Sequence, residues 1–346
     1  EKAGFDGVTV TSLDPKLKLA PPDDIVQEKT RISAIQNVAT AFHSVEENGT
    51  FDPAPLQGIS ENILQDIIAQ QKNLVQLTDI RLHDTYTFAH SVNVAILSSL
   101  LGVLLKLSRE EQLKLTLGGL LHDIGKITVP YEILTKAGHL TDDEWSVMQG
   151  HPEAGRQRLK KMFPNDTLLS TIALQHHEHI DGSGYPNHLK GEQIHRYGRI
   201  VAIADVYDAL TSVRPYKRAY TPSVAHRLMA TCSPGHFDLD LLKLFFDNVA
   251  IYPVGTILKT QDGYAIVKKV EFGYTLTPVV CVFANREGKL LDTPSDLDLK
   301  EAPKGMLDGV ISDSELYHFI HNINVDPAIF LQENTEKEDA SQENTE

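Results

Sequence analysis

The stretches LHDIGK, residues 121–126, and HHEHIDGSGYP, residues 176–186, decide the fold and the chemistry of this chain. Each stretch places two side chains that can bind a metal ion next to each other, a His-Asp pair in the first and a His-His pair in the second. A site that holds more than one cation needs such pairs, because one carboxylate can bridge two ions while imidazoles fill the outer positions. The two stretches therefore predict a metal centre with more than one ion.

The chain around these stretches has the apolar periodicity of helices from about residue 25 to residue 250. Helix starts are marked by polar capping residues and by proline in the first turn, at Ser60, at Ser108 with Glu111, at Thr141 with Glu144, and at Thr221 before Pro222. Ser60 is expected to cap a long amphipathic helix that extends to about residue 75. Because side chains on helices are held rigidly, they can converge as ligands on the interior of a bundle.

The pattern changes after Tyr252 and Pro253. The segments 264–270 and 279–283 are short, rich in β-branched residues and separated by turn residues, which predicts a small antiparallel sheet. A last short helix is expected near residues 314–322. The final residues, from 331 on, are acidic and repetitive, and we expect them to be disordered.

Composition excludes several functional classes. A formal net charge of -15 argues against binding of long nucleic acid, because that affinity comes from lysine and arginine replacing phosphate counterions. The hydrophobic fraction of 41% predicts a globular core, and no apolar run is long enough to cross a bilayer. Cys232 and Cys281 form no C-x-x-C pair, so we expect two buried thiols in a reducing cytoplasm. The chain begins at Glu1 without a charged and apolar leader, which we take to indicate a fragment of a longer protein.

Three further side chains extend the predicted metal centre: His90, His151 and Asp205, each in a helical pattern or at a helix end. An ionised aspartate among apolar neighbours, as at Asp205, is costly unless it is paired or bound to metal. Taken singly, a histidine on an apolar face is more often a hydrogen-bonded core residue, and Asp205 could cap a helix or pair with an arginine. Taken together, the residues are hard to explain by coincidence. The candidate set is His90, His122, Asp123, His151, His176, His177 and Asp205.

Three ordered strings carry a resemblance to a known family: HDIGK at 122–126, DGSGYP at 181–186 and ADVYDALTSVRPY at 204–216. From about Asp84 to Phe245 the chain resembles the HD-GYP phosphodiesterases of bacteria. We therefore expect a mainly α fold, an HD-domain helical bundle with an N-terminal helical segment and a small C-terminal antiparallel β addition. The expected parts are an N-terminal linker and helical segment (1–80), an HD-GYP catalytic helical domain (81–252), a β-rich addition with a terminal helix (253–330) and an acidic tail (331–346).

The resemblance also implies the role of the candidate set. It implies that His90, His122, Asp123, His151, His176, His177 and Asp205 are ligands of an iron or manganese centre, with Asp123 bridging. Histidine and carboxylate ligands alone would also suit Zn or Ni, and the resemblance favours Fe or Mn over these and over Mg. Some family members carry a glutamate four residues before the first histidine and hold three ions. Tyr86 stands there in this chain, so we predict two ions, and Asp84 is either an outer-shell group or a helix cap.

Substrate contacts require cations that are not metal ligands. Lys126 could place an ammonium near a metal-bound phosphate, and the family assigns phosphate contacts to this lysine and to the segment that contains Arg214 and Lys217. The alternative for all three is a solvated surface cation. In the loop DGSGYP, Gly184 permits a close backbone approach, and Tyr185 either contacts the substrate or anchors the loop against the bundle.

The resemblance implies hydrolysis of cyclic dinucleotides, chiefly cyclic di-GMP. We therefore expect a phosphodiesterase in which a metal-bridging hydroxide attacks phosphorus in line and opens cyclic di-GMP to linear pGpG, with GMP as the product of a second cut. Asp123 and Lys126 are the expected catalytic groups. One alternative is a cyclic GMP-AMP phosphodiesterase, and another is a sensor that binds the dinucleotide or a partner without turnover. We expect a homodimer through the N-terminal helices and an upstream sensory or receiver domain as further partners.

Overall fold

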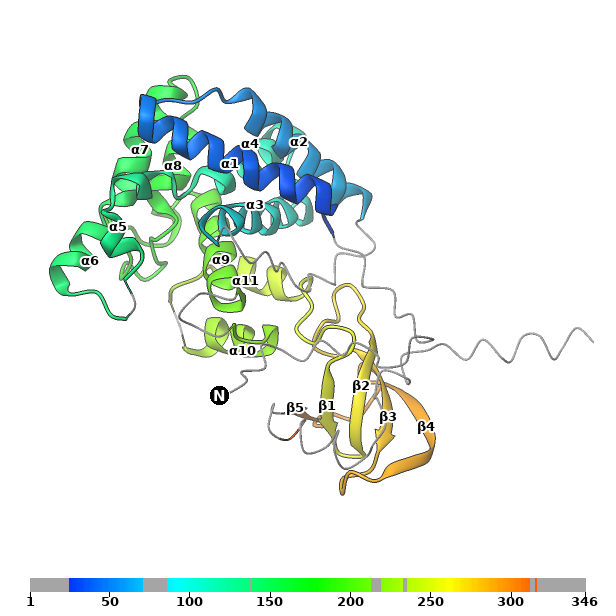
Figure 1. The fold of residues 1–346 in the computed structure, drawn as a ribbon. Coiled ribbons are helices and arrows are strands. Elements are labelled where there is room, and N and C mark those ends of the chain that lie inside the picture. The colour runs from blue at the N-terminus through cyan, green and yellow to red at the C-terminus, as the bar shows by residue number, and fades with distance from the viewer. Residues whose placement is uncertain are drawn as a thin grey trace, which may run out of the picture. The chain divides into compact units, whose positions relative to one another are not determined.

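A computed structural model describes residues 25–70, 86–136, 138–212, 219–232, 235–311 and 315 (Figure 1). The chain divides into two compact units, a helical unit from Asp23 to Ile251 and a second unit that contains the strands after Tyr252. The predicted mainly helical fold with a small antiparallel sheet is confirmed. Among the described residues, no helix is both long enough and apolar enough to cross a membrane.

The helical unit is built around one apolar helix. α3 (Tyr86–Leu104) packs against α4 (Arg109–Leu121), α9 (Arg196–Thr211) and two N-terminal helices, α1 (Glu28–Asn48) and α2 (Ala54–Ala69). Ile96, Leu100 and Leu101 of α3 are fully buried, as expected for a helix that is apolar all round. The other helices are α5 (Tyr131–Leu134), α6 (Asp142–Met148), α7 (His151–Met162), α8 (Thr167–Gln175), α10 (Pro222–Arg227) and α11 (Leu239–Phe246), with short 3-10 turns at Ile124–Thr128 and Gly191–Gln193 and a π turn at Leu228–Cys232.

Most predicted helix starts are confirmed, and one is wrong. Ser108 with Glu111 and Thr141 with Glu144 form complete capping boxes at α4 and α6, and Thr221 caps α10 ahead of its proline. Ser60 does not cap a helix. It lies inside α2, where its buried hydroxyl donates to the carbonyl of Leu56 at 2.8 Å. Proline in the first turn of α2 lets the helix begin earlier, at Ala54, because proline fixes a helical backbone angle and needs no N–H partner there.

One glycine explains how the turn after α4 is held against α7. A Cβ on Gly125 would lie 1.9 Å from the carbonyl oxygen of His151 and 2.6 Å from the backbone nitrogen of Gly155. Only a residue without a side chain permits this approach. The glycine in HDIGK therefore fixes the distance between two segments that carry candidate ligands.

The second unit is a five-stranded antiparallel sheet in the order β4-β3-β2-β1-β5. Its strands are β1 (Ile257–Thr260), β2 (Gly263–Lys269), β3 (Val279–Ala284), β4 (Leu290–Asp298) and β5 (Leu307–Val310). One face buries Ile257, Ile266 and Phe283 around the free thiol of Cys281. The side chain of Cys232, the predicted helix near 314–322 and the acidic tail lie outside the described residues.

Candidate metal centre

Side chains from α3, α7, α9 and the turns after α4 and α8 meet inside the helical unit. They are the residues singled out from the sequence: His90, His122, Asp123, His151, His176, His177 and Asp205. Their donor atoms form three overlapping groups in which the atoms lie within 4.8 Å of one another. Asp123 belongs to two of these groups, so its carboxylate lies between two sets of imidazoles. All seven residues are buried except His177, which is partly buried.

Three of the histidines, His122, His151 and His176, share one hydrogen-bond pattern. Each places Nδ1 2.8–2.9 Å from a carbonyl oxygen three residues earlier, in the last turn of a helix. Because a carbonyl oxygen can only accept, Nδ1 carries the proton and donates, and each Nε2 keeps its lone pair. The backbone therefore fixes the tautomer that binds a metal ion, and the imidazoles in turn satisfy free carbonyls at the helix ends.

These lone pairs face one another and a carboxylate. Nε2 of His151 lies 3.4 Å from Nε2 of His176 and 3.3 Å from Oδ1 of Asp123. In the part of the chain that the structure describes, Nε2 of His122 and Oδ1 of Asp123 are buried and have no hydrogen-bond partner. Lone pairs and a carboxylate oxygen that face each other without a donor are unfavourable, and a divalent cation would satisfy all of them. The donor set thus fits metal ions.

A carboxylate that sequence reasoning missed orients His90. Oδ2 of Asp208 lies 2.7 Å from Nδ1 of His90, while Oδ1 accepts from the Asn93 amide and the Ser212 hydroxyl at 2.7 Å each. With Nδ1 held in this way, Nε2 of His90 faces Asp205 at 3.1 Å. Asp208 follows Asp205 by three residues on α9, and this spacing was the available signal, since residues three apart share a helix face.

Burial and neighbouring charges shift the pKa values of the cluster in opposite directions. Burial lowers the pKa of His176 to about 4 and lowers that of His177 well below its usual value, so both are neutral at pH 7. Burial also acts to lower the pKa of His90, but hydrogen bonds to Asp205 and Asp208 outweigh it and raise that pKa to about 9. For Asp205, burial acts to raise the pKa, but the hydrogen bond to His90 and nearby imidazoles hold it below its ordinary value.

Lys126, singled out as a phosphate contact, lies beside Asp123. Its Nζ donates to Oδ2 of Asp123 at 2.5 Å. Burial opposes ionisation of Asp123, but the charge on Lys126 and the adjacent His122 imidazole hold the pKa of this carboxyl well below its ordinary value. The Lys126 side chain is 26% exposed, so its ammonium can also meet an anion that approaches Asp123 from solvent. Arg214, Lys217, Asp84 and the side chain of Tyr86 lie outside the described residues.

The DGSGYP loop folds against the second histidine pair. A Cβ on Gly184 would lie 2.3 Å from the backbone nitrogen of His179 and 2.4 Å from the carbonyl oxygen of His177. Tyr185 donates its backbone N–H to that carbonyl at 3.0 Å and stacks on the His177 imidazole with ring centroids 4.8 Å apart. Glycine at 184 therefore permits the backbone approach that holds the Tyr185 ring over His177.

Glu178, which is buried, closes this loop and was also missed from the sequence. Its carboxylate accepts the backbone N–H groups of Asn187 and Leu189 at 2.7 and 2.9 Å. In the same loop, Asp181 accepts the N–H of Ser183 at 2.8 Å, a contact that stabilises a turn. A glutamate inside a run of histidines was a signal, but its partners are backbone groups that no side-chain pattern reveals.

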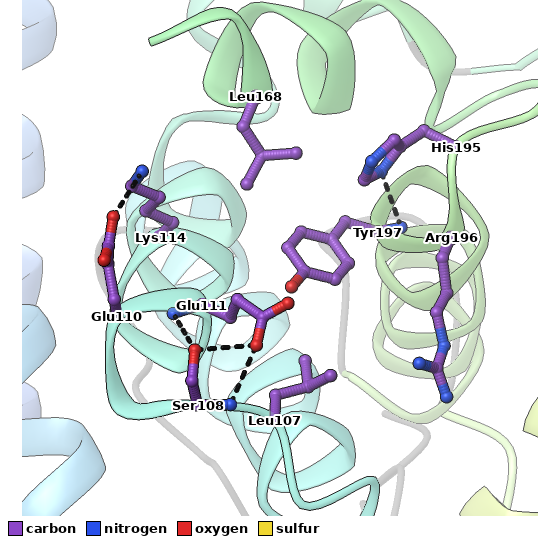
Figure 2. A pocket seen from close by; sticks show the side chains of 9 residues that line it. All are labelled: Leu107, Ser108, Glu110, Glu111, Lys114, Leu168, His195, Arg196 and Tyr197. Atoms are coloured by element: carbon purple, nitrogen blue, oxygen red, sulfur yellow. Dashed lines mark hydrogen bonds and ion pairs between the residues drawn. The ribbon is translucent and has the colours of Figure 1, made fainter.

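A second polar hollow lies at the N-terminal ends of helices that carry the cluster. Figure 2 shows it between the starts of α4 and α9, with Leu168 of α8 on its wall. Lys114 forms ion pairs with Glu110 at 2.9 Å and with Asp166 at 3.2 Å, and Glu111 accepts from both the N–H and the hydroxyl of Ser108. Among the described residues, none that lines this hollow belongs to a group able to hold a metal ion.

Comparison with known proteins supports the assignment of the fold and the family. The family described as HD domain matches residues 62–241, slightly more than half of the chain. A cyclic di-GMP phosphodiesterase of Pseudomonas aeruginosa is 36% identical over 318 residues, which is 90% of this chain and 76% of that protein. A 3'3'-cGAMP-specific phosphodiesterase of Vibrio cholerae is 39% identical over 181 residues, which is 52% of this chain and 42% of that protein.

A solved structure agrees at the level of the fold. An HDG"Y"P protein from Bdellovibrio bacteriovorus superimposes with a TM-score of 0.52 at 22% identity, covering 62% of this chain and 69% of that one. The family match, the Pseudomonas relative and the ordered strings around the cluster agree with one another. The chain therefore belongs to the HD domain family, as a member of the HD-GYP phosphodiesterases.

Proposed function

We propose that this protein hydrolyses cyclic dinucleotides, with cyclic di-GMP as the substrate and linear pGpG as the first product. The observation that carries the proposal is the convergence of imidazole lone pairs, with tautomers fixed by the backbone, on the carboxylate of Asp123. The Pseudomonas relative, which matches nine tenths of the chain, is named for the same activity. The Vibrio relative is named for cyclic GMP-AMP, so that dinucleotide is the second candidate substrate.

The proposed cofactor is a pair of divalent ions, iron or manganese. Its support is the grouping of donors: one group contains Asp123 with His151, His176 and His177, and another contains Asp123 with His90 and His122. A carboxylate common to both groups is suited to bridge two ions, and the neutral imidazoles and ionised Asp205 complete the set. When bound, such ions neutralise charge on a phosphate oxygen and lower the pKa of a water so that it attacks at neutral pH.

The chain's own residues are proposed to bind and orient the phosphodiester. Asp123 and Asp205 supply negative charge that fixes the cations, while Asp208 holds His90 in one orientation. Lys126 would transfer part of its contact from Asp123 to a non-bridging phosphate oxygen, stabilising the charge that develops as the 3'-oxygen leaves in line. Gly184 and Tyr185 form the wall beside His177, and Arg214 and Lys217 are proposed to bind the second phosphate.

The test is a turnover assay on the purified chain. Protein stripped with a chelator is reloaded without oxygen with Fe(II) or Mn(II) and incubated with cyclic di-GMP, and the products are separated by chromatography. We expect pGpG from the wild-type chain and none from His122→Ala. The matched control is His195→Ala, which removes a histidine that caps α9 outside the cluster and should leave turnover intact.

Two outcomes would replace the proposal with a rival. Preferential hydrolysis of cyclic GMP-AMP in a competition assay would assign that dinucleotide as the substrate. Binding of the dinucleotide without turnover, in protein shown by elemental analysis to hold its metal, would assign a sensor. If wild type and His122→Ala hydrolyse cyclic di-GMP at the same rate with metal restored, the cluster has no catalytic role.

Localisation and assembly are part of the same proposal. A free buried thiol at Cys281 is compatible with a reducing cytoplasm. A homodimer through the N-terminal helices is proposed, in which the exposed apolar residues Ile32 of α1 and Ile68 of α2 would be covered. Sedimentation of the wild-type chain beside an Ile32→Glu, Ile68→Glu variant tests this, with the variant expected as a monomer. A sensory or receiver domain upstream is proposed as the regulatory input.

A further inference from the structure

Three aromatic rings form a column that leads from the candidate metal centre to the protein surface. The Tyr185 ring stacks on the His177 imidazole with an interplanar angle of 25°. The Trp145 ring meets Tyr185 edge to face, with centroids 6.0 Å apart and an interplanar angle of 75°. Trp145 is thus separated from a candidate metal ligand by one aromatic ring.

The helix that carries Trp145 is fixed, although the side chain is exposed. α6 starts at a complete capping box, in which Thr141 accepts the N–H of Glu144 and Glu144 accepts the N–H of Thr141. The backbone N–H of Trp145 donates to the carbonyl of Thr141 at 2.8 Å, and Lys136 donates to Glu144 from the preceding segment. Trp145 is nevertheless 46% exposed. A rigid helix therefore presents a large aromatic surface to water beside the site.

The rings of this column are not equally available to a substrate. His177 has one face covered by Tyr185, and Tyr185 has one face covered by His177. Tyr185 is also partly buried. Trp145 is the ring with substantial free surface. Stacking of a nucleobase on an aromatic side chain stabilises single-strand nucleic-acid complexes and is tolerant of base identity.

The order of the metal centre and the aromatic rings corresponds to the order of phosphate, ribose and base in a nucleotide. A phosphodiester bound beside Asp123 carries its bases one ribose further from the metal centre, and the column leads outward from His177 in steps of 4.8 Å to Tyr185 and 6.0 Å to Trp145. We propose that Trp145 is a substrate-binding residue that stacks on one purine base of the cyclic dinucleotide while the scissile phosphate lies at the metal centre. This inference rests on the proposed function. Because guanine and adenine both offer a π face, it assigns affinity to Trp145 and not a choice between the two dinucleotides.

The chain provides its own reporter, because Trp145 is its only tryptophan. The phosphorothioate analogue of cyclic di-GMP, which resists hydrolysis, is titrated into Mn(II)-loaded protein while tryptophan emission is recorded. We expect saturable quenching, since a stacked purine contacts the indole directly. Ribose 5-phosphate, which carries phosphate without a base, should leave the emission unchanged.

Kinetics separate binding of a base from support of Tyr185. Trp145→Ala should raise KM for cyclic di-GMP about tenfold or more while kcat changes little, and Trp145→Phe should restore most of the loss. Hydrolysis of methyl p-nitrophenyl phosphate, a diester without a purine, should be the same in wild type and Trp145→Ala. Val147→Ala, on the same helix and 45% exposed, is the matched control and should leave both reactions unchanged.

Several results would overturn the inference. Unquenched emission at saturating analogue, or an unchanged KM in Trp145→Ala while the wild type turns over cyclic di-GMP, would remove Trp145 from the binding site and leave the proposed function standing. A fall in kcat on both substrates with KM unchanged would assign Trp145 to the support of Tyr185 instead. Absence of turnover of either dinucleotide by wild-type protein would overturn the proposed function and this inference with it.

Discussion

Helices α4 and α8 have opposite polar chemistry at their two ends. At the N-terminal ends, the polar groups satisfy one another: Ser108 pairs with Glu111 and Lys114 with Glu110 (Figure 2), and Lys114 also pairs with Asp166. At the C-terminal end of α4, His122 and Asp123 bury polar atoms that have no hydrogen-bond partner among the described residues, and at that of α8, Nε2 of His176 faces Nε2 of His151 at 3.4 Å. Buried unpartnered atoms cost free energy, and a ligand such as a cation that completes them removes this cost. The difference marks the C-terminal end as the functional one and the N-terminal end as structural.

The largest effect should come from the shared carboxylate. Asp123→Ala removes the oxygens common to two donor groups, and we expect turnover of cyclic di-GMP to fall by at least about 10³-fold, as for groups that act as a unit. Metal content should fall with it. Elemental analysis and chromatography of products measure both. A variant that kept its metal and its turnover would show that Asp123 is not a ligand.

A smaller effect on metal affinity should follow when the carboxylate of Asp208, which accepts from Nδ1 of His90, loses its charge. Asp208→Asn leaves the shape but weakens the acceptor for Nδ1 of His90, so metal affinity or activity should fall by about 10- to 100-fold. The matched change at the other end is Asp166→Asn, at the N-cap of α8, which should leave metal affinity unchanged. Equal losses in the two variants would contradict the proposed division between the ends.

The proton on His90 predicts the pH dependence of metal binding. With a pKa of about 9, raised from 6.5, His90 must lose its proton before Nε2 can bind a cation. Metal affinity of chelator-treated protein should therefore rise with pH up to about 9, by up to about tenfold per pH unit for this one proton. Competition with a chelator at several pH values measures it.

The same proton affects stability with the opposite sign. Because the pKa of His90 in the folded chain is above its usual value, protonation stabilises the fold fully below pH 6.5, and this contribution is lost as pH rises through 9. In chelator, the wild-type chain should lose stability in that window and Asp208→Asn should lose less. A pH profile of metal affinity that is flat from pH 7 to 9 would contradict the assignment.

The smallest effect is expected at the structural end. Ser108→Ala removes the N-cap of α4 and should lower the free energy of unfolding by about 1 kcal/mol. Chemical denaturation measures this loss. Metal affinity should not change, because the cap satisfies only its own helix. A loss of metal binding comparable to that of Asp208→Asn would show that the two ends are coupled.

Structural features that depend only on residues close together in the chain could be predicted from the sequence. The capping boxes at Ser108 and Thr141 follow from residues three apart, and the seven candidate ligands were found from short strings and apolar surroundings. Ser60 misled because an equally local signal, proline in the first turn of α2, starts the helix earlier. The capping preference of serine and the first-turn preference of proline predict different helix starts. The proline determined the start, because its ring fixes the backbone angle φ.

Features that depend on packing between distant segments could not be predicted. The partner of His90 is Asp208, 118 residues away, and the pair exists because α3 packs on α9. Glu178 binds backbone groups of its own loop, which carry no side-chain signature. The contact of Trp145 with Tyr185 could not be predicted either. Trp145 lies on α6 and Tyr185 in the loop after α8, and a single aromatic residue in the sequence does not indicate its partner.

The carbonyl groups that hold Nδ1 of His122, His151 and His176 have one more consequence. Each imidazole is hydrogen-bonded to a helix end whether or not Nε2 binds a metal ion. The positions of the rings should therefore be the same with and without metal. Removal of metal from such a site requires no local unfolding. A metal ion bound by these residues would therefore be released and rebound without a change in the ring positions.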